Sequence, residues 1–172
     1  MKITGFLLRE AIRRWELRRD TAANQFEDSL SHFPGEEKQA PDEISELFLE
    51  AEIRVAKLQA AQSRYNLEVR VAVMGEGMTL CEAVKRLGGA GRMDKMWRVA
   101  AGGGKKERYA YRDDTRQAGE IRASRTIAVK DAMSRANKAS AFAGALRAAV
   151  AKGNGTEYTA TELNIDPSLF TE

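Results

Sequence analysis

The residues that could perform nucleophilic or metal chemistry are few in this chain and lie far apart in the sequence. It has one cysteine, Cys81, and one histidine, His32, and no recognisable motif surrounds either. A cysteine nucleophile needs a base beside it, and a zinc site needs several Cys or His ligands. Glu46 and Glu50 lie one helical turn apart, but the Glu-x-x-His that completes a carboxylate metal site is absent. We therefore expect no catalytic residue, no metal site, no cofactor and no enzymatic activity.

Two glycine-rich segments resemble phosphate-binding loops only superficially. Gly102-Gly103-Gly104-Lys105-Lys106 lacks the Ser or Thr that follows the lysine of a P-loop, and it lacks the upstream glycine. Gly88-Gly89-Ala90-Gly91 lacks the strand–turn–helix context of a dinucleotide-binding fingerprint. We interpret both segments as interruptions between helices.

A basic segment is the strongest candidate binding region. Residues 85–138 carry 15 basic and 6 acidic residues, although the whole chain has a net charge of only +3. Trp97, Tyr109 and Tyr111 are interleaved with these cations and could stack on bases. The cations expected to contact a polyanion are Arg92, Lys95, Arg98, Lys105, Lys106, Arg108, Arg112 and Arg116.

The acidic ends of the chain offer the basic segment another partner. Residues 1–50 have a net charge of −4 and residues 151–172 a net charge of −3. The basic segment could therefore pair with the acidic ends of the same or a neighbouring chain rather than with a polyanion. No helix-turn-helix, zinc-finger or RNA-recognition signature is visible, which favours the pairing interpretation.

Two apolar stripes with heptad spacing dominate the first 72 residues and predict the architecture. The first is the less regular of the two and is interrupted by Arg19. It consists of Leu8, Ile12, Trp15, Arg19, Ala22, Phe26, Leu30 and Phe33. The second consists of Phe48, Ala51, Val55, Leu58, Gln62, Tyr65 and Val69. Spacings of three and four residues keep one helical face apolar, so each stripe needs a partner helix. With Pro34, Gly35 and Pro41 between them, they predict a long antiparallel, coiled-coil-like hairpin over residues 4–72.

The rest of the chain predicts shorter elements and one more long helix. Thr79 and Glu82 have capping-box spacing, so we expect short helices over residues 79–100, interrupted by the glycines. Residues 105–128 read as a basic extended segment or β-hairpin. A helix over residues 129–152 should follow, ended by Gly153-Asn154-Gly155. Its expected apolar face is Val129, Met133, Ala136, Ala139, Ala143, Leu146 and Val150. Residues 1–155 then form one helical domain, and residues 156–172 form a tail expected to become ordered by docking on a neighbour.

Several short motifs of this chain occur in the same order in a known bacterial family. They are Leu7-Leu8-Arg9-Glu10, Pro34-Gly35-Glu36-Glu37, Tyr65-Asn66, Gly77-Met78-Thr79-Leu80-Cys81-Glu82-Ala83, Glu120-Ile121-Arg122 and Asn154-Gly155-Thr156. The chain resembles, up to about residue 158, a small and mostly uncharacterised family of helical proteins, some of whose members are labelled septicolysin. The resemblance implies a helical, self-associating protein without an established activity. The chain departs from the family pattern at Gly102-Gly103-Gly104 and after Thr156.

These observations predict a mainly α protein that acts as a non-enzymatic, self-associating scaffold or interaction protein. The hairpin is too long for one further helix to cover, so its remaining apolar surface should be buried in a homo-oligomer. The alternatives are a nucleic-acid-binding protein that uses residues 85–138 and a membrane-active, cytolysin-like helical protein. Because no apolar run approaches the length of a membrane span or a signal peptide, we expect a cytoplasmic location.

Overall fold

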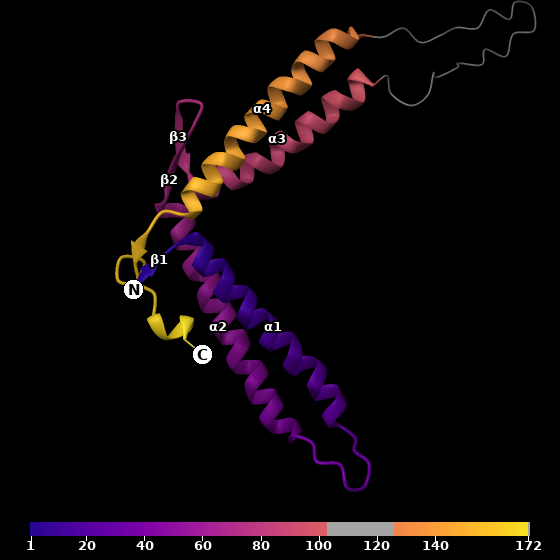
Figure 1. Ribbon diagram of the computed structural model, residues 1–172, viewed down its shortest axis with the longest axis vertical. Helices are drawn as coiled ribbons and strands as arrows, with labels where there is room; N and C mark the ends of the chain where they lie inside the picture. Colours follow the sequence, from indigo (N-terminus) through magenta and orange to yellow (C-terminus); the bar gives the residue numbers. More distant parts are fainter. Residues whose placement is uncertain (103–125, 172) are drawn as a thin grey trace, which may run out of the picture.

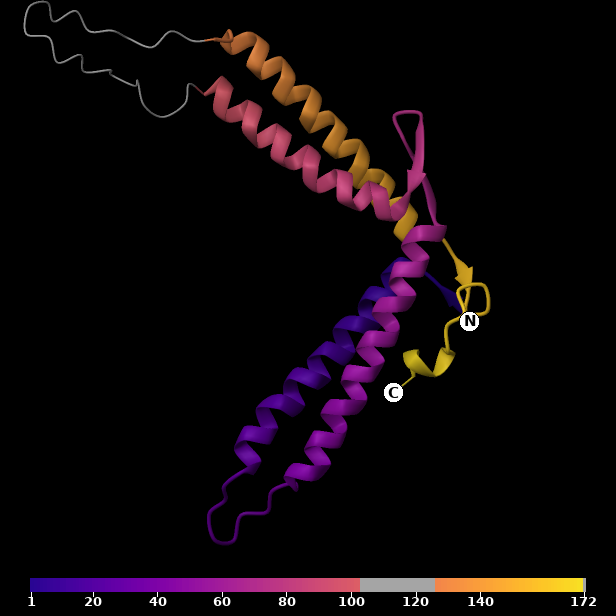
Figure 2. The same ribbon diagram turned by 180° about the vertical axis from the view of Figure 1, so that it is seen from behind.

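The computed structural model describes residues 1–102 and 126–171, and it confirms a mainly α fold with small antiparallel strand pairs. Two helical hairpins diverge from a common junction in a wide V (Figure 1). The first arm consists of α1 (Gly5–Ser29) and α2 (Pro41–Glu68), and the second of α3 (Leu80–Ala101) and α4 (Val129–Asn154). Seen from behind, both chain ends lie on one side of the molecule near the junction (Figure 2).

The first arm forms because the two predicted stripes meet along its length. Thr4 caps α1 by accepting a hydrogen bond from the Leu7 amide at 3.1 Å, and Pro41 occupies the first turn of α2. On α1, Leu8, Ile12, Trp15 and Ala22 are buried, as are Ala51, Val55, Leu58, Tyr65 and Val69 of the second stripe. The stripes are less covered toward the far end of the arm, where Phe26, Phe33 and Phe48 are exposed.

A tight β-hairpin follows α2 and begins at residue 70, inside the range 4–72 predicted to be a helical hairpin. Strands β2 (Arg70–Val73) and β3 (Glu76–Thr79) pair antiparallel, with Val73 opposite Glu76. The turn residues Met74 and Gly75 both have positive φ, at 52° and 89°, as a two-residue type I′ turn requires. The β-branched run Val69, Val71 and Val73 favours a strand, and pairing with β3 ends the helix.

The predicted break at the glycines of residues 88–91 is wrong, because α3 is one continuous helix. Thr79 caps it as expected, accepting a hydrogen bond from the Glu82 amide at 3.1 Å. A glycine inside a helix costs only about 1 kcal/mol, which tertiary packing can offset. Here α3 packs along α4 with Ala83 and Ala90 buried.

The third long predicted helix, α4, pairs with α3 rather than returning to the first arm (Figure 1). Its packed face is also shifted from the predicted one. The buried residues are Ala132, Ala136, Ala143, Leu146, Ala149, Gly153 and Asn154. Val129 and Met133 are 46% and 42% exposed. Helix α3 lies so close to α4 that α4 contacts it with alanines rather than with these larger residues.

The junction between the arms is built on close backbone approach. A Cβ atom on Gly5 would lie 2.5 Å from Asn154 Oδ1, and one on Gly153 would lie 2.8 Å from Val71 Cγ1. The fully buried Tyr65 of α2 places its hydroxyl 2.7 Å from the carbonyl oxygens of both Gly153 and Thr156. The end of α4 is therefore fixed directly against α2.

The C-terminal residues 156–171, which we call the strap, dock on the chain's own first arm. The prediction that this tail becomes ordered only on a neighbour is therefore wrong. Strand β4 (Tyr158–Thr159) pairs with β1 (Lys2–Ile3), and a 3₁₀ helix, η1 (Pro167–Phe170), lies beside the arm. The Trp15 indole N–H donates to the Leu169 carbonyl at 3.2 Å. Burial of Leu163, Ile165 and Leu169 supplies the apolar contact that holds the strap.

Candidate assembly interface

The side of α2 that faces away from its buried seam carries a second heptad-spaced row. We call it the outer stripe, and it consists of Leu49, Ile53, Ala56, Ala60, Ser63 and Leu67. The spacings alternate between four and three residues, and every member is exposed. Leu49, Ile53 and Leu67 have exposed fractions of 58%, 47% and 57%. A helix with apolar heptads on two opposite faces needs a partner on each, and α1 supplies only one.

Charges beside the outer stripe change sign along α2. Residues 41–52 contain five acidic residues and no basic one, whereas residues 53–68 contain three basic residues and one acidic one. Glu50 forms an ion pair with Arg54 at 2.8 Å, and Arg64 donates to the Asn164 carbonyl at 3.2 Å. The acidic half also suits the positive end of the helix dipole.

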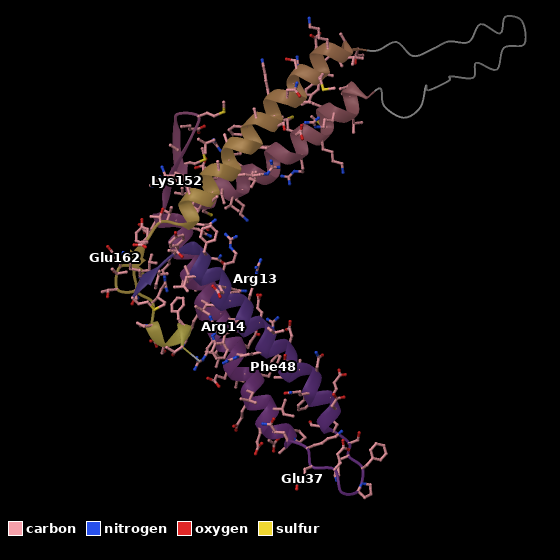
Figure 3. The ribbon with its side chains drawn as sticks, viewed as in Figure 1. Arg13, Arg14, Glu37, Phe48, Lys152 and Glu162 are labelled. Atoms are coloured by element: carbon pink, nitrogen blue, oxygen red, sulfur yellow. The ribbon has the colours of Figure 1, made fainter. Side chains whose placement is uncertain are left out.

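The far end of the first arm is both acidic and apolar. Residues 20–52 carry ten acidic residues and one lysine. Figure 3 shows Glu37 in the loop at this end. Phe33 and Leu30 are 81% and 64% exposed there. Exposed aromatic and aliphatic side chains among like charges are typical of a surface that meets a partner.

The second arm has the opposite charge. Helices α3 and α4 together contain ten basic and three acidic residues. Of the predicted polyanion contacts, Arg92, Lys95 and Arg98 are exposed on α3, and Arg98 is paired with Asp94 at 2.9 Å. The remaining predicted contacts, Lys105, Lys106, Arg108, Arg112 and Arg116, lie outside the described residues, as does most of the predicted extended segment 105–128. Trp97 is half-buried under Arg135, whose guanidinium carbon lies 4.8 Å from the ring centroid.

The two arms carry their opposite charges away from each other. They share only the junction and then diverge, so the acidic end of the first arm lies far from α3 and α4 (Figure 1). Among the described residues, the basic helices α3 and α4 therefore do not reach the acidic far end of the first arm of the same chain.

The described residues offer no centre for metal chemistry. Within residues 1–102 and 126–171, no three His, Cys, Asp or Glu side chains converge as metal ligands would. Cys81 is a free, half-buried thiol in the first turn of α3, and His32 lies in the loop between α1 and α2. In the same part of the chain, no helix is long and apolar enough to cross a membrane.

The perturbed ionisable groups have structural roles. Burial raises the pKa of the Tyr65 phenol above its ordinary value. Hydrogen bonds from the backbone amides of Thr159 and Ser168 lower the pKa of Glu162 and Asp166 in the strap. An ion pair with Arg86 likewise lowers the pKa of Glu76 in the β-hairpin. These groups fix the junction, the strap and the hairpin, and none of them converges on a cleft.

Comparisons with known proteins support the fold alone. No protein-family model and no curated protein matches the sequence. A crystal structure of a functionally unknown conserved protein from Corynebacterium diphtheriae is similar, with a TM-score of 0.65 and 17% sequence identity. The match covers 92% of this chain and 100% of that chain. The resemblance to the septicolysin-labelled family stays a prediction.

Proposed function

We propose that the protein is a non-enzymatic helical scaffold of the cytoplasm that self-associates through the outer stripe of α2. The observation that carries this proposal is the second, uncovered heptad row on a helix whose other face is already buried. A long two-armed molecule without a metal-ligand cluster in its described residues suits a role in holding partners at a distance. Self-association also buries apolar surface that the fold itself leaves exposed.

The size of the stripe predicts a weak, concentration-dependent dimer. Full burial of a Leu or Ile contributes about 1.5–3 kcal/mol, and the three large side chains of each stripe are about half exposed. Burial of all six side chains would therefore contribute at most on the order of 6 kcal/mol. Association costs about 4–15 kcal/mol, so these side chains offset little more than the low end of that cost, and the alanines and flanking ion pairs add to them. We expect dissociation constants of about 0.1–1 mM.

The test is sedimentation equilibrium over roughly 10–1000 µM protein, a range that brackets this affinity. We expect wild type to shift from monomer to dimer, and Ile53→Glu to remain monomeric because it places a charge in the interface. Leu17→Glu is the matched control, since Leu17 is 68% exposed on α1 and lies outside the stripe. A monomeric wild type at the highest concentration would contradict the proposal.

A second candidate function is polyanion binding by the second arm, favoured by the excess of seven basic charges on α3 and α4. Binding of a fluorescent single-stranded oligonucleotide should then weaken steeply with salt, because bound counterions are released. Arg92→Glu with Lys95→Glu should reduce both the affinity and the salt slope. Lack of binding at low ionic strength would exclude this function.

A further inference from the structure

We infer that the self-association partner of α2 is α2 of a second copy, running antiparallel, with the two-fold axis between residues 54 and 55. In this register Leu49 lies against Ala60 of the second copy, and Ile53 lies against Ala56. The inference rests on the proposed function and specifies the geometry of its interface. Three observations support it: the sizes of the stripe residues, the order of the flanking charges and the place where the strap docks.

The sizes of the stripe residues complement one another only when the helices run in opposite directions. The large residues Leu49 and Ile53 occupy the N-terminal part of the stripe, and the small residues Ala56 and Ala60 follow. An antiparallel coiled coil pairs the two alternating seam positions with each other, so Leu49 and Ile53 each face an alanine. Leu67 lies opposite Asp42 at the end of the interface. A parallel pair would place Leu against Leu and Ala against Ala, which leaves a gap at the alanines.

The charges beside the stripe select the same arrangement. On the flank nearer the strap, the antiparallel register brings Glu50 close to Lys57 of the second copy and Glu43 close to Arg64. Each contact occurs twice in a two-fold dimer, and every one joins opposite charges. Shifting the register by one heptad, so that Leu49 meets Leu67, keeps Glu50 beside a cation, Arg64. The shift also brings the Lys57 side chains of the two copies together and leaves Glu43 opposite Val71. The four opposite-charge contacts of the inferred register become two, and one like-charge contact is added, which disfavours the shifted register.

The strap leaves the stripe open and lines one edge of it. Arg54 of α2 donates to the Thr171 carbonyl at 3.4 Å, and Arg64 donates to the Asn164 carbonyl at 3.2 Å. Asp166 lies close enough to Lys57 for their charges to interact. The cations of this flank are therefore positioned by the strap while Glu43, Glu50, Lys57 and Arg64 remain exposed. In the inferred dimer, the acidic end of each first arm lies beside the junction of the other copy, where the basic second arm begins.

Disulfide mapping tests the register in a Cys81→Ser background, which removes the native thiol. Leu49→Cys and Ala60→Cys are made separately, and one carries a tag. Each variant alone places its two cysteines eleven residues apart along the axis, about 16 Å and beyond disulfide reach. Mild oxidation should therefore give at least ~10-fold more cross-linked dimer from the mixture than from either variant alone. A mixture of Leu49→Cys and Leu67→Cys reports the shifted register.

A charge-exchange series in the full chain gives a second readout. Glu50→Lys should weaken the dimer at least ~10-fold, and Glu50→Lys combined with Lys57→Glu should restore it. Glu10→Lys is the matched control, because Glu10 is an exposed residue of α1 that lies outside the outer stripe and its flanks. Efficient cross-linking of single variants, or of the Leu49→Cys and Leu67→Cys mixture, overturns the inferred register but leaves self-association standing. A dimer without any of these cross-links also overturns it, and a monomeric wild type overturns the proposed function itself.

Discussion

Removing one hydroxyl group at the junction should destabilise the protein measurably. The Tyr65 hydroxyl has one proton to share between the carbonyl oxygens of Gly153 and Thr156, both 2.7 Å away. In Tyr65→Phe the Gly153 oxygen keeps the Thr156 amide as a donor at 3.1 Å, whereas the Thr156 oxygen loses its side-chain donor. A buried group left without its partner costs about 1–3 kcal/mol. The Tyr65–Thr156 contact is part-buried, so we expect a loss at the low end, about 1 kcal/mol. For a chain of this length that corresponds to about 2–4 °C in Tm.

The assay is urea unfolding followed by circular dichroism at 222 nm, at one fixed protein concentration because self-association would stabilise the folded state. Tyr158→Phe is the matched control. Tyr158 packs edge-on against Tyr65 with ring centroids 5.8 Å apart, but its hydroxyl makes no hydrogen bond to the described residues. A loss for Tyr65→Phe no larger than that for Tyr158→Phe would refute the reasoning.

The stability of wild type and of Tyr65→Phe, measured at alkaline pH, provides a further readout. Burial raises the pKa of Tyr65 in the folded state above its ordinary value of 10.0. The stabilising contribution of the neutral phenol is therefore fully present below pH 10 and is lost as pH rises through the folded-state pKa. Tyr65→Phe should lose less stability than wild type in this range.

Two other predictions concern the cap of α3 and the strap. Thr79→Ala removes the acceptor for the Glu82 amide and should cost about 1 kcal/mol, or about 2–4 °C in Tm. Thr161→Ala should not, because Thr161 is exposed and its side chain makes no hydrogen bond to the part of the chain that the structure describes. The pKa values of Glu162 and Asp166 in the folded protein lie below their ordinary 4.5 and 3.8. The two carboxylates therefore stabilise the docked strap at pH values above 4.5 and 3.8, respectively, and this stabilisation is lost as the pH falls through the lower folded-state pKa. Amide hydrogen exchange should thus show the strap opening below about pH 4 before the helices, and Glu162→Gln should open it at higher pH; equal exchange rates in strap and helices would contradict this.

The fold was predictable where a single local signal decided the outcome. The paired stripes, the prolines between them and the Thr79 cap predicted the first arm and the start of α3, because periodicity and capping are read within one segment. The continuity of α3 was not predictable in this way, since three glycines weaken the helix locally and only α4, far along the chain, compensates. The type I′ turn was missed because Met74 is an unusual residue at a position with positive φ.

The candidate interface shows the opposite limitation. The outer stripe has the same heptad spacing as the buried seam of α2, but its residues are smaller, so only the seam stands out in the sequence. Spacing alone cannot tell which of two rows faces α1, a choice fixed by packing with Trp15, Leu8 and Ile12. The strap was equally hidden, although Thr159 and Glu162 have capping-box spacing that marked an ordered turn.

The pairing of β1 with β4 has a consequence for how the protein is made. The first arm leaves the ribosome before the second arm, but Ile3 and Trp15 receive their cover from residues 158–171, which are synthesised long after them. A nascent chain therefore displays an incomplete first arm until the strap has left the ribosome, with both the outer stripe and the strap site uncovered. Chaperone contact and premature pairing of neighbouring nascent chains on one polysome should concentrate on the first arm, and docking of the strap should end that period.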